Sequence, residues 1–214
     1  MRLPEWIKTK RFSGIHNTKH VLRSHGVYTV CEEARCPNIG ECFSRRAVTF
    51  MILGSKCTRN CGFCYVESSC PEPLDTDEPE RIALAAKEMG LKYVVITSVT
   101  RDDLLDGGAV HFAQTVYAVR RHIKEAKVEV LTPDFKGDIS AIITVMESRP
   151  DVYGHNIETV PRLYSIVRPK AGYIRSLGIL KYAKKISPGT NTKSGVMLGL
   201  GETLNEVIDV LKEL

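Results

Sequence analysis

Six of the seven cysteines in this 214-residue chain fall into two sets of three. Cys57, Cys61 and Cys64 are spaced as Cys-x3-Cys-x2-Cys and directly follow a short apolar run, 48–53, that predicts a buried strand. One short loop therefore presents three thiolates. Three thiolates can hold a four-iron cluster and leave one iron open, and an open iron can bind a chelating substrate.

Zinc binding is the main alternative for this loop. A structural zinc ion takes four protein ligands, usually as two closely spaced cysteine pairs, and a catalytic zinc would need a nearby histidine that this loop lacks. The spacing favours an iron–sulfur cluster, and a zinc-stabilised binding module without catalysis is the competing interpretation.

Cys31, Cys36 and Cys42 form the second set, spaced as Cys-x4-Cys-x5-Cys ahead of the predicted strand. Free cysteines are ordinary in protein cores, but three within twelve residues of a segment containing Gly and Pro indicate a second metal cage. The seventh cysteine, Cys70, lies six residues beyond Cys64. We interpret it as an ordinary loop thiol, with a substitute-ligand or redox role as the alternative.

Composition indicates a folded cytoplasmic protein, with 43% apolar and 26% charged residues. No apolar run reaches the roughly 18 residues that cross a bilayer, and no secretion signal is evident, so no membrane partner is expected. Thiols in a reducing compartment suit metal binding better than disulfides. Residues 1–30 carry six Lys/Arg against one acid, which suits an acidic partner, but nothing in the pattern favours nucleic acid.

Strands and helices alternate after residue 47. Apolar runs predict strands at 48–53, 93–96, 128–131, 152–153 and 196–198, and helical patterns occur at 77–90, 110–124, 139–147, 174–186 and from 204 onward. This order implies an α/β fold with a parallel sheet and right-handed crossovers. Polar loops after nearly every strand favour a partial (βα) TIM-like barrel, with an open doubly wound sheet as the alternative.

The first 45 residues show no sustained period and are expected to be irregular. We therefore divide the chain into an N-terminal extension that carries the second cysteine set, 1–46, and a partial barrel, 47–214. The last helix has no capping residue, so we expect the barrel to be cut short at its C-terminal side.

The pattern Cys-x3-Cys-x-aromatic-Cys, in which Phe63 is the aromatic residue, resembles the signature of radical S-adenosylmethionine (SAM) enzymes. The resemblance implies that Cys57, Cys61 and Cys64 hold a [4Fe-4S] cluster. Its open iron would bind the amino and carboxylate groups of SAM, and Phe63 would lie near the adenine.

The two cysteine sets together resemble the lipoyl synthase family. The likeness is carried by stretches at 33–39, 47–54, 96–104, 106–108, 154–160, 173–177 and 192–202. It implies that Cys31, Cys36 and Cys42 hold an auxiliary [4Fe-4S] cluster, which the family closes with a serine from an Arg-Ser-Ser-Tyr motif. This chain has no such motif, so the fourth ligand stays unassigned.

The same resemblance implies the reaction and its partners. Two sulfur atoms would be inserted at carbons 6 and 8 of a protein-bound octanoyl-lysine, with the auxiliary cluster as sulfur donor and two SAM molecules consumed. The partners would be octanoylated lipoyl-carrier domains, an electron donor such as ferredoxin or flavodoxin, and an Fe–S cluster delivery protein. Another two-cluster radical SAM enzyme, sulfur-inserting or peptide-modifying, is the alternative.

Polar residues at the ends of predicted strands are candidate SAM contacts. Thr97 and Ser98 are expected at the methionine end, and Asn156 and Glu158 at the ribose hydroxyls. The glycines of the fifth strand's loop, Gly199 and Gly201, would let backbone amides approach the ligand. A helix cap explains Glu158 equally well, as a satisfied buried side chain explains the neighbouring His155. Lys193 either faces solvent or neutralises a carboxylate inside the barrel.

Overall fold

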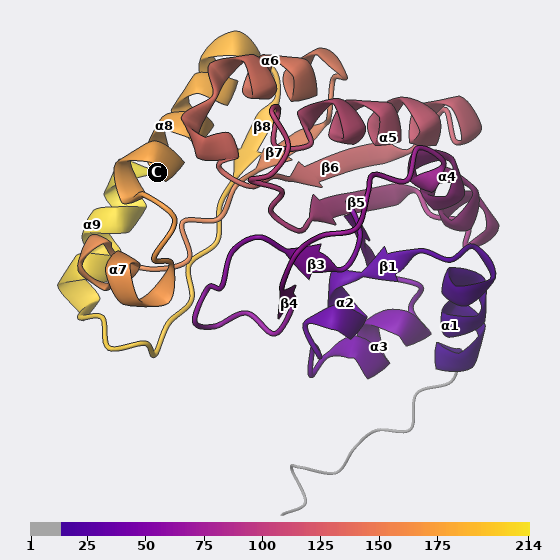
Figure 1. Ribbon diagram of the computed structural model, residues 1–214, viewed down its shortest axis with the longest axis horizontal. Coiled ribbons are helices and arrows are strands. Elements are labelled where there is room, and N and C mark those ends of the chain that lie inside the picture. Colours follow the sequence, from indigo (N-terminus) through magenta and orange to yellow (C-terminus); the bar gives the residue numbers. More distant parts are fainter. Residues whose placement is uncertain (1–13) are drawn as a thin grey trace, which may run out of the picture.

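The main sheet of the computed structural model, which describes residues 14–214, contains six strands in the order β1-β2-β5-β6-β7-β8 (Figure 1). Their bounds are Tyr28–Thr29 (β1), Thr49–Ile52 (β2), Tyr93–Ser98 (β5), Lys127–Leu131 (β6), Val152–Gly154 (β7) and Asn191–Lys193 (β8). β1 pairs antiparallel to β2, and every other neighbouring pair is parallel. The predicted α/β partial barrel is confirmed.

Helices connect the parallel strands and lie along the outside of the sheet (Figure 1). They are α4 (Glu78–Glu88), α5 (Ala109–His122), α6 (Ile139–Glu147) and α8 (Tyr173–Ile186), and α9 (Leu204–Glu213) follows the last strand of the described residues. Along the barrel, α4 packs on α5, α5 on α6, and α6 on α8. No helix of the described residues is long and apolar enough to cross a membrane.

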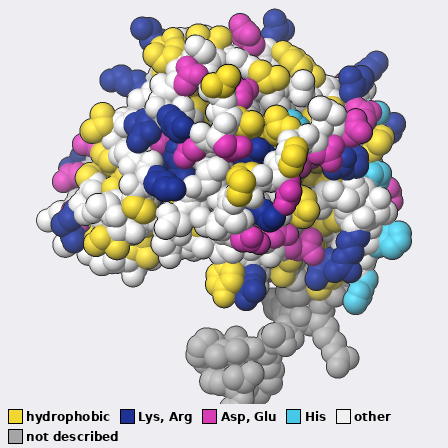
Figure 2. All heavy atoms as spheres, viewed as in Figure 1, with side chains coloured by type: hydrophobic (Ala, Val, Ile, Leu, Met, Phe, Trp, Pro, Cys, Tyr) yellow, Lys and Arg dark blue, Asp and Glu magenta, His cyan; other side chains and the backbone are white. Residues whose placement is uncertain are grey.

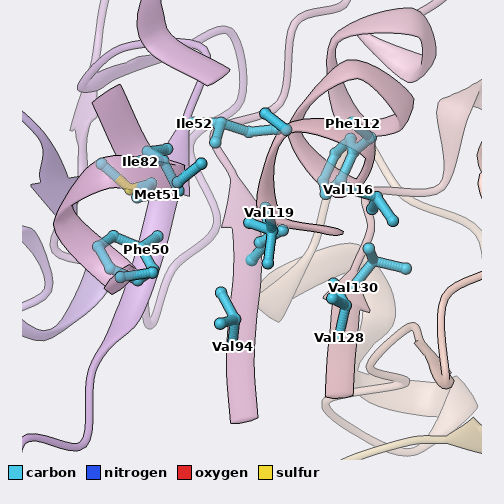
Figure 3. Packing of buried hydrophobic residues seen from close by; sticks show 14 of the residues in the cluster. Phe50, Met51, Ile52, Ile82, Val94, Phe112, Val116, Val119, Val128 and Val130 are labelled. Atoms are coloured by element: carbon cyan, nitrogen blue, oxygen red, sulfur yellow. The ribbon is translucent and has the colours of Figure 1, made fainter. Parts of the chain in front are cut away.

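Apolar side chains fill the space between the sheet and these helices (Figure 3). Val94, Val128 and Val130 of the strands lie in one cluster with Val116 and Val119 of α5, and all five are fully buried. Because side chains alternate along a strand, the residues between them face the inside of the barrel. The outer face therefore supplies the core, and the inner face is free to carry polar groups.

Glu129 lies on the inner face with a buried carboxylate. It accepts hydrogen bonds from Tyr93 Oη at 2.6 Å and from Lys193 Nζ at 2.7 Å. Lys193 thus pairs with a buried carboxylate while its own side chain is 59% exposed, so both of its interpretations hold in part.

The expectation of an irregular N-terminal segment is wrong for residues 14–45. This part contains α1 (Ile15–Ser24), α2 (Val30–Glu33) and α3 (Ile39–Ser44), and β1 joins the main sheet beside β2. α2 and α3 each span less than two turns, too short to produce a recognisable period in the sequence. The division between 1–46 and 47–214 stays a prediction.

Four of the basic residues near the N-terminus, Arg2, Lys8, Lys10 and Arg11, lie outside the described residues. On the face shown in Figure 2, basic and acidic side chains of the described part are interspersed.

The last strand begins earlier than the apolar pattern predicts. β8 is the polar segment Asn191–Lys193, whereas the run 196–198 lies in a loop where Val196 forms one isolated bridge with Glu158. Val196 and Met197 pack against a second, smaller core. Burial in that core explains their apolar character without strand pairing.

Candidate functional site

The first cysteine loop leaves β2 at the carboxyl end of the barrel strands. Cys57 lies in β3 (Lys56–Cys57), which pairs with β4 (Glu67–Ser68), and Cys61 and Cys64 lie between these two strands. The Cys64 N–H donates to the Cys61 carbonyl at 3.0 Å, and the Gly62 N–H donates to the Val167 carbonyl at 2.9 Å. The three thiols are thus presented from one loop that is anchored at both ends.

The sulfur of Cys57 accepts two backbone hydrogen bonds, from the N–H of Arg59 at 3.4 Å and from the N–H of Thr100 at 3.3 Å. Thr58 donates its N–H and its hydroxyl to the Thr100 carbonyl. N–H donors directed at cysteine sulfur are a common feature of iron–sulfur ligands, and they stabilise negative charge on the sulfur.

Arg59 ties the cysteine loop to the loops after β5 and β6. Its guanidinium binds both carboxylate oxygens of Asp102, at 2.7 and 2.9 Å, and donates to Asp134 at 2.7 Å. Burial alone would raise the pKa of Asp134, but the hydrogen bond and charge of Arg59 more than offset it and lower the pKa. Asp134 is fully buried and therefore depends on this partner.

The turn that leads from β2 into the cysteine loop is held by a second buried carboxylate. Glu78 accepts the Leu53 N–H at 2.7 Å and contacts His111 Nε2 at 2.7 Å. Arg101 donates to the Leu53 carbonyl at 3.3 Å. Leu53 has a φ of 69°, and a methyl group at Gly108 would lie 2.3 Å from its side chain. Glu78, Arg101 and Gly108 thus all contact Leu53, whose backbone is strained.

A cavity of about 120 Å³ opens beside the cysteine loop, where β5, β6 and β7 end. Four of the predicted SAM-contacting residues line it: Thr97, Ser98, Asn156 and Glu158. The other lining residues are Thr100, Leu131, Thr132, Pro133, His155 and Arg168.

Two buried polar atoms at this cavity have no hydrogen-bond partner, Ser98 Oγ and Arg168 Nε. Arg168 is otherwise fixed, because its Nη1 donates to the Asn156 carbonyl at 2.8 Å and to the Ile157 carbonyl at 3.3 Å. Unsatisfied buried donors are rare in folded proteins, so these atoms mark a place suited to a polar ligand. A carboxylate-bearing molecule such as SAM fits this donor set.

Electrostatics connect the cavity to the cysteine loop. Burial raises the pKa of Cys61, and the nearby charge of Arg168 opposes that rise. Burial also raises the pKa of Cys64, and the neighbouring Glu158 adds to the effect. Burial raises the pKa of Glu158 itself, which has a φ of 67°. The cavity and the thiols therefore belong to one site.

His155 is a structural member of this wall. Its Nδ1–H donates to the Thr132 carbonyl at 2.9 Å, and its Nε2 accepts from the Ser176 hydroxyl at 2.9 Å. The carbonyl can only accept, which assigns the proton to Nδ1. Burial lowers the pKa of His155 to about 4, so the ring is neutral near pH 7.

The remaining predicted contacts lie outside the cavity wall. Phe63 sits in the cysteine loop and is 38% exposed. Gly199 and Gly201 lie in an exposed loop, where Glu202 accepts the N–H of Gly199 and that of Leu200. None of these three residues lines the cavity with Ser98 and Glu158.

Sequence reasoning missed Arg59 and Arg168. Each lies close in sequence to a feature that was recognised, Arg59 inside the cysteine motif and Arg168 ten residues after Glu158. Only the folded chain shows that both guanidinium groups are buried at the site.

The second cysteine set is presented by the N-terminal helices. Cys31 lies in α2 and Cys42 in α3, and the N–H of Cys36 between them donates to the Cys31 carbonyl at 3.0 Å. Burial raises the pKa of Cys31, and the nearby Cys36 and Cys42 sulfurs raise it further. The charges of the three thiolates therefore act on one another.

Within residues 14–214, no three His, Cys, Asp or Glu side chains surround a single point as the ligands of one metal ion would. A four-iron cluster spreads its cysteines over separate irons and has no such requirement. The donor chemistry of both cysteine sets thus fits a cluster.

A larger cavity, about 690 Å³, lies between α8 and the end of α9. Its lining is a mixture of apolar residues and lysines and includes no cysteine. We therefore place the candidate site at the smaller cavity, because its polar lining lies beside the cysteine loop.

Comparison with known proteins identifies the family. The model of the Radical SAM superfamily matches residues 51–214. A curated lipoyl synthase from Caldanaerobacter subterraneus subsp. tengcongensis is 56% identical, over 100% of this chain and 75% of its own length. The chain belongs to the lipoyl synthase family. Membership implies a [4Fe-4S] cluster and SAM, and it makes the chain a radical SAM enzyme rather than a zinc-stabilised binding module.

Other comparisons agree with this assignment. The lipoyl synthase of Rubrobacter xylanophilus is 55% identical over 99% of this chain and 66% of its own length. The chain therefore spans two thirds to three quarters of these relatives. A crystal structure of methylornithine synthase matches with a TM-score of 0.56 at 15% identity, over 92% of this chain and 59% of that one. At that identity the likeness shows the fold alone.

Proposed function

We propose that this chain is a lipoyl synthase that inserts sulfur at carbons 6 and 8 of an octanoyl-lysine on a carrier protein domain. Cys57, Cys61 and Cys64 hold the cluster that binds SAM. The observation that carries the proposal is the cavity beside this loop, which is lined by Ser98 and Arg168, two residues that each hold a buried polar atom without a hydrogen-bond partner. Family membership supplies the reaction class.

The cluster and SAM, when bound, supply a carbon radical that can remove hydrogen from an unactivated C–H bond, which side chains cannot do. The chain's own residues bind and orient. The free donors of Ser98 and Arg168 suit the carboxylate of SAM, with Thr97 supporting the same wall. Asn156 and Glu158 suit the ribose hydroxyls. Phe63, Gly199 and Gly201 do not line this cavity. We propose that they contact the parts of SAM that extend beyond it, with Phe63 beside the adenine.

Cys31, Cys36 and Cys42 hold the auxiliary [4Fe-4S] cluster, which is the sulfur-donating substrate of the reaction. All three cysteines are partly buried, which supports this role because a partly shielded cluster is less exposed to loss of sulfur to solvent. The partners are an octanoylated lipoyl-carrier domain, a reductant such as ferredoxin or flavodoxin, and an Fe–S delivery protein that restores the consumed cluster.

Two sets of cysteine variants test the assignment. Cys57→Ala, Cys61→Ala or Cys64→Ala is expected to abolish reductive cleavage of SAM. The triple variant of Cys31, Cys36 and Cys42 is expected to cleave SAM but to form no thiolated octanoyl peptide by mass spectrometry. Cys70→Ala is the matched control and should preserve both reactions.

Two results would contradict the proposal. Formation of 5′-deoxyadenosine by the Cys57→Ala protein would remove the SAM cluster from this loop. Lipoyl product from the triple variant would remove the sulfur-donor role from the second cysteine set.

A further inference from the structure

The two cysteine-bearing segments meet at the exposed side chains of Arg35 and Tyr65. The Arg35 guanidinium lies 4.4 Å from the centre of the Tyr65 ring. Its Nη1 also donates a hydrogen bond to the Tyr65 hydroxyl at 3.2 Å. A cation over an aromatic face and a hydrogen bond at its edge together fix both the distance and the angle between the two groups.

Each partner is the immediate neighbour of a proposed cluster ligand. Arg35 precedes Cys36, and Tyr65 follows Cys64. A displacement of either side chain is therefore transmitted to a ligand within one peptide unit.

Both segments also rest on the same core, because Cys31 and Cys42 of the first and Cys57 and Val66 of the second pack against it. Arg35 itself has a φ of 49°, a left-handed conformation that Arg rarely adopts.

We propose that Arg35 and Tyr65 are positioning residues that hold the auxiliary cysteine segment against the SAM cysteine loop. The pair sets the separation and orientation of the two clusters. This inference rests on the proposed two-cluster function, in which an alkyl radical formed at one site must reach sulfur at the other.

The two steps of the reaction depend on different segments. SAM cleavage depends only on the loop of Cys57, Cys61 and Cys64, whereas sulfur transfer also depends on the second segment. Loosening the Arg35–Tyr65 contact therefore leaves SAM cleavage intact and lowers the yield of thiolated product per cleavage.

Hydrogen exchange on the anaerobically reconstituted protein tests the contact without measuring activity. Arg35→Ala is expected to speed exchange about threefold to tenfold in peptides covering 57–70, and Tyr65→Ala to do the same in peptides covering 31–42. The double variant should match either single variant, because both remove the same contact. Arg45→Ala is the control, since Arg45 pairs only with Glu41 of its own helix, at 2.9 Å.

Conservative variants separate positioning from a general loss of structure. Tyr65→Phe keeps the ring and loses the hydrogen-bonding hydroxyl, and Arg35→Lys keeps the charge. Both are expected to retain part of the protection and part of the product yield. The ratio of 5′-deoxyadenosine to thiolated peptide should rise severalfold in the alanine variants and stay unchanged in Arg45→Ala.

The outcomes distinguish this inference from the proposed function. Faster exchange confined to the mutated segment, or additive effects in the double variant, would overturn the bridging role. An unchanged ratio of 5′-deoxyadenosine to product, with both clusters present, would overturn its role in the reaction. Iron near four per chain in the unmodified protein would instead count against the two-cluster function, while the exchange data would still decide whether the bridge exists.

Discussion

Arg59 holds the cysteine loop through charges that are removed from water. Its side chain is 5% exposed and that of Asp134 is 0% exposed. Removing one partner of such a pair leaves an uncompensated buried charge, which costs far more than the net worth of the pair. Arg175 also approaches Asp134, at 3.4 Å, and offers only partial compensation.

We expect Arg59→Ala to lower the free energy of unfolding by about 3–5 kcal/mol, measured by urea denaturation. Adding Asp134→Ala should recover part of that loss, because the stranded carboxylate is then absent. A double variant whose loss equals the sum of the two single losses would show that the residues act independently.

His155 makes stability depend on pH. Its pKa of about 4 in the folded protein lies below the value near 6.5 of an unfolded histidine. The unfolded chain therefore binds the proton more readily than the folded protein does. The contribution of His155 to the free energy of unfolding is complete above about pH 6.5 and is lost as the pH falls toward 4. The loss is on the order of 3 kcal/mol.

The measurement is the free energy of unfolding between pH 7.5 and pH 4.5, compared with His155→Gln. The variant should lose less stability than the unmodified protein over this range, because it lacks the titrating ring. Parallel curves for the two proteins would remove His155 as the cause.

At the level of elements, apolar periodicity correctly predicted the strands and helices that surround the main core. The strands near 93 and 128 and the helices near 110 and 139 occur within a few residues of their predicted positions, because each has one face buried against the other. β8 was missed because it is polar, and α2 and α3 because they are short. The local pattern of apolar residues indicates which residues are buried. It does not predict a strand that is formed by backbone pairing of polar residues, or a helix of less than two turns.

The same limit applies to the site. Cysteine spacing indicated the thiols of the cysteine loop. Polar residues at strand ends indicated Ser98, Asn156 and Glu158, and these three residues line one cavity. Arg59 was missed because its partners lie far away in sequence. Asp134, for example, is 75 residues from Arg59. Arg168 was missed because its main partners are the backbone carbonyls of Asn156 and Ile157, which residue types do not indicate.

The turn between β2 and the cysteine loop requires glycine at position 108. Its φ is 91°, and an added Cβ would lie 2.3 Å from Leu53 Cδ1. We expect Gly108→Ala to destabilise the protein, with overpacking costing about 1–3 kcal/mol and the left-handed backbone adding about 1–2 kcal/mol. Thermal unfolding measures the change.

Gly178→Ala is the matched control for that substitution. Gly178 lies in α8, and nothing lies within 4 Å of the added methyl group. Alanine there should stabilise the helix by about 0.5–1 kcal/mol. Equal effects at positions 108 and 178 would show that the contact with Leu53 does not constrain the turn.

At the scale of the whole molecule, the N-terminal helices and the barrel share one core. Phe43 of α3 is fully buried in the same cluster as Phe50 and Ile82. The Thr18 hydroxyl donates to the Phe43 carbonyl at 2.8 Å and joins α1 to α3. The segment that carries Cys31, Cys36 and Cys42 is therefore expected to fold and unfold together with the segment that carries the loop 57–64.

This coupling predicts that Phe43→Ala weakens the whole described structure. Loss of a fully buried phenyl ring costs about 3–5 kcal/mol. Because the core is shared, the slowest-exchanging amides of β5 and β6 should lose protection by the same free energy, and unfolding should stay a single transition. Tyr28→Ala is the control, since Tyr28 is 43% exposed and its loss should cost less than about 0.5 kcal/mol. If protection falls only within residues 14–46 while β5 and β6 keep theirs, the N-terminal helices are a separate folding unit, and each cysteine set is stabilised by a core of its own.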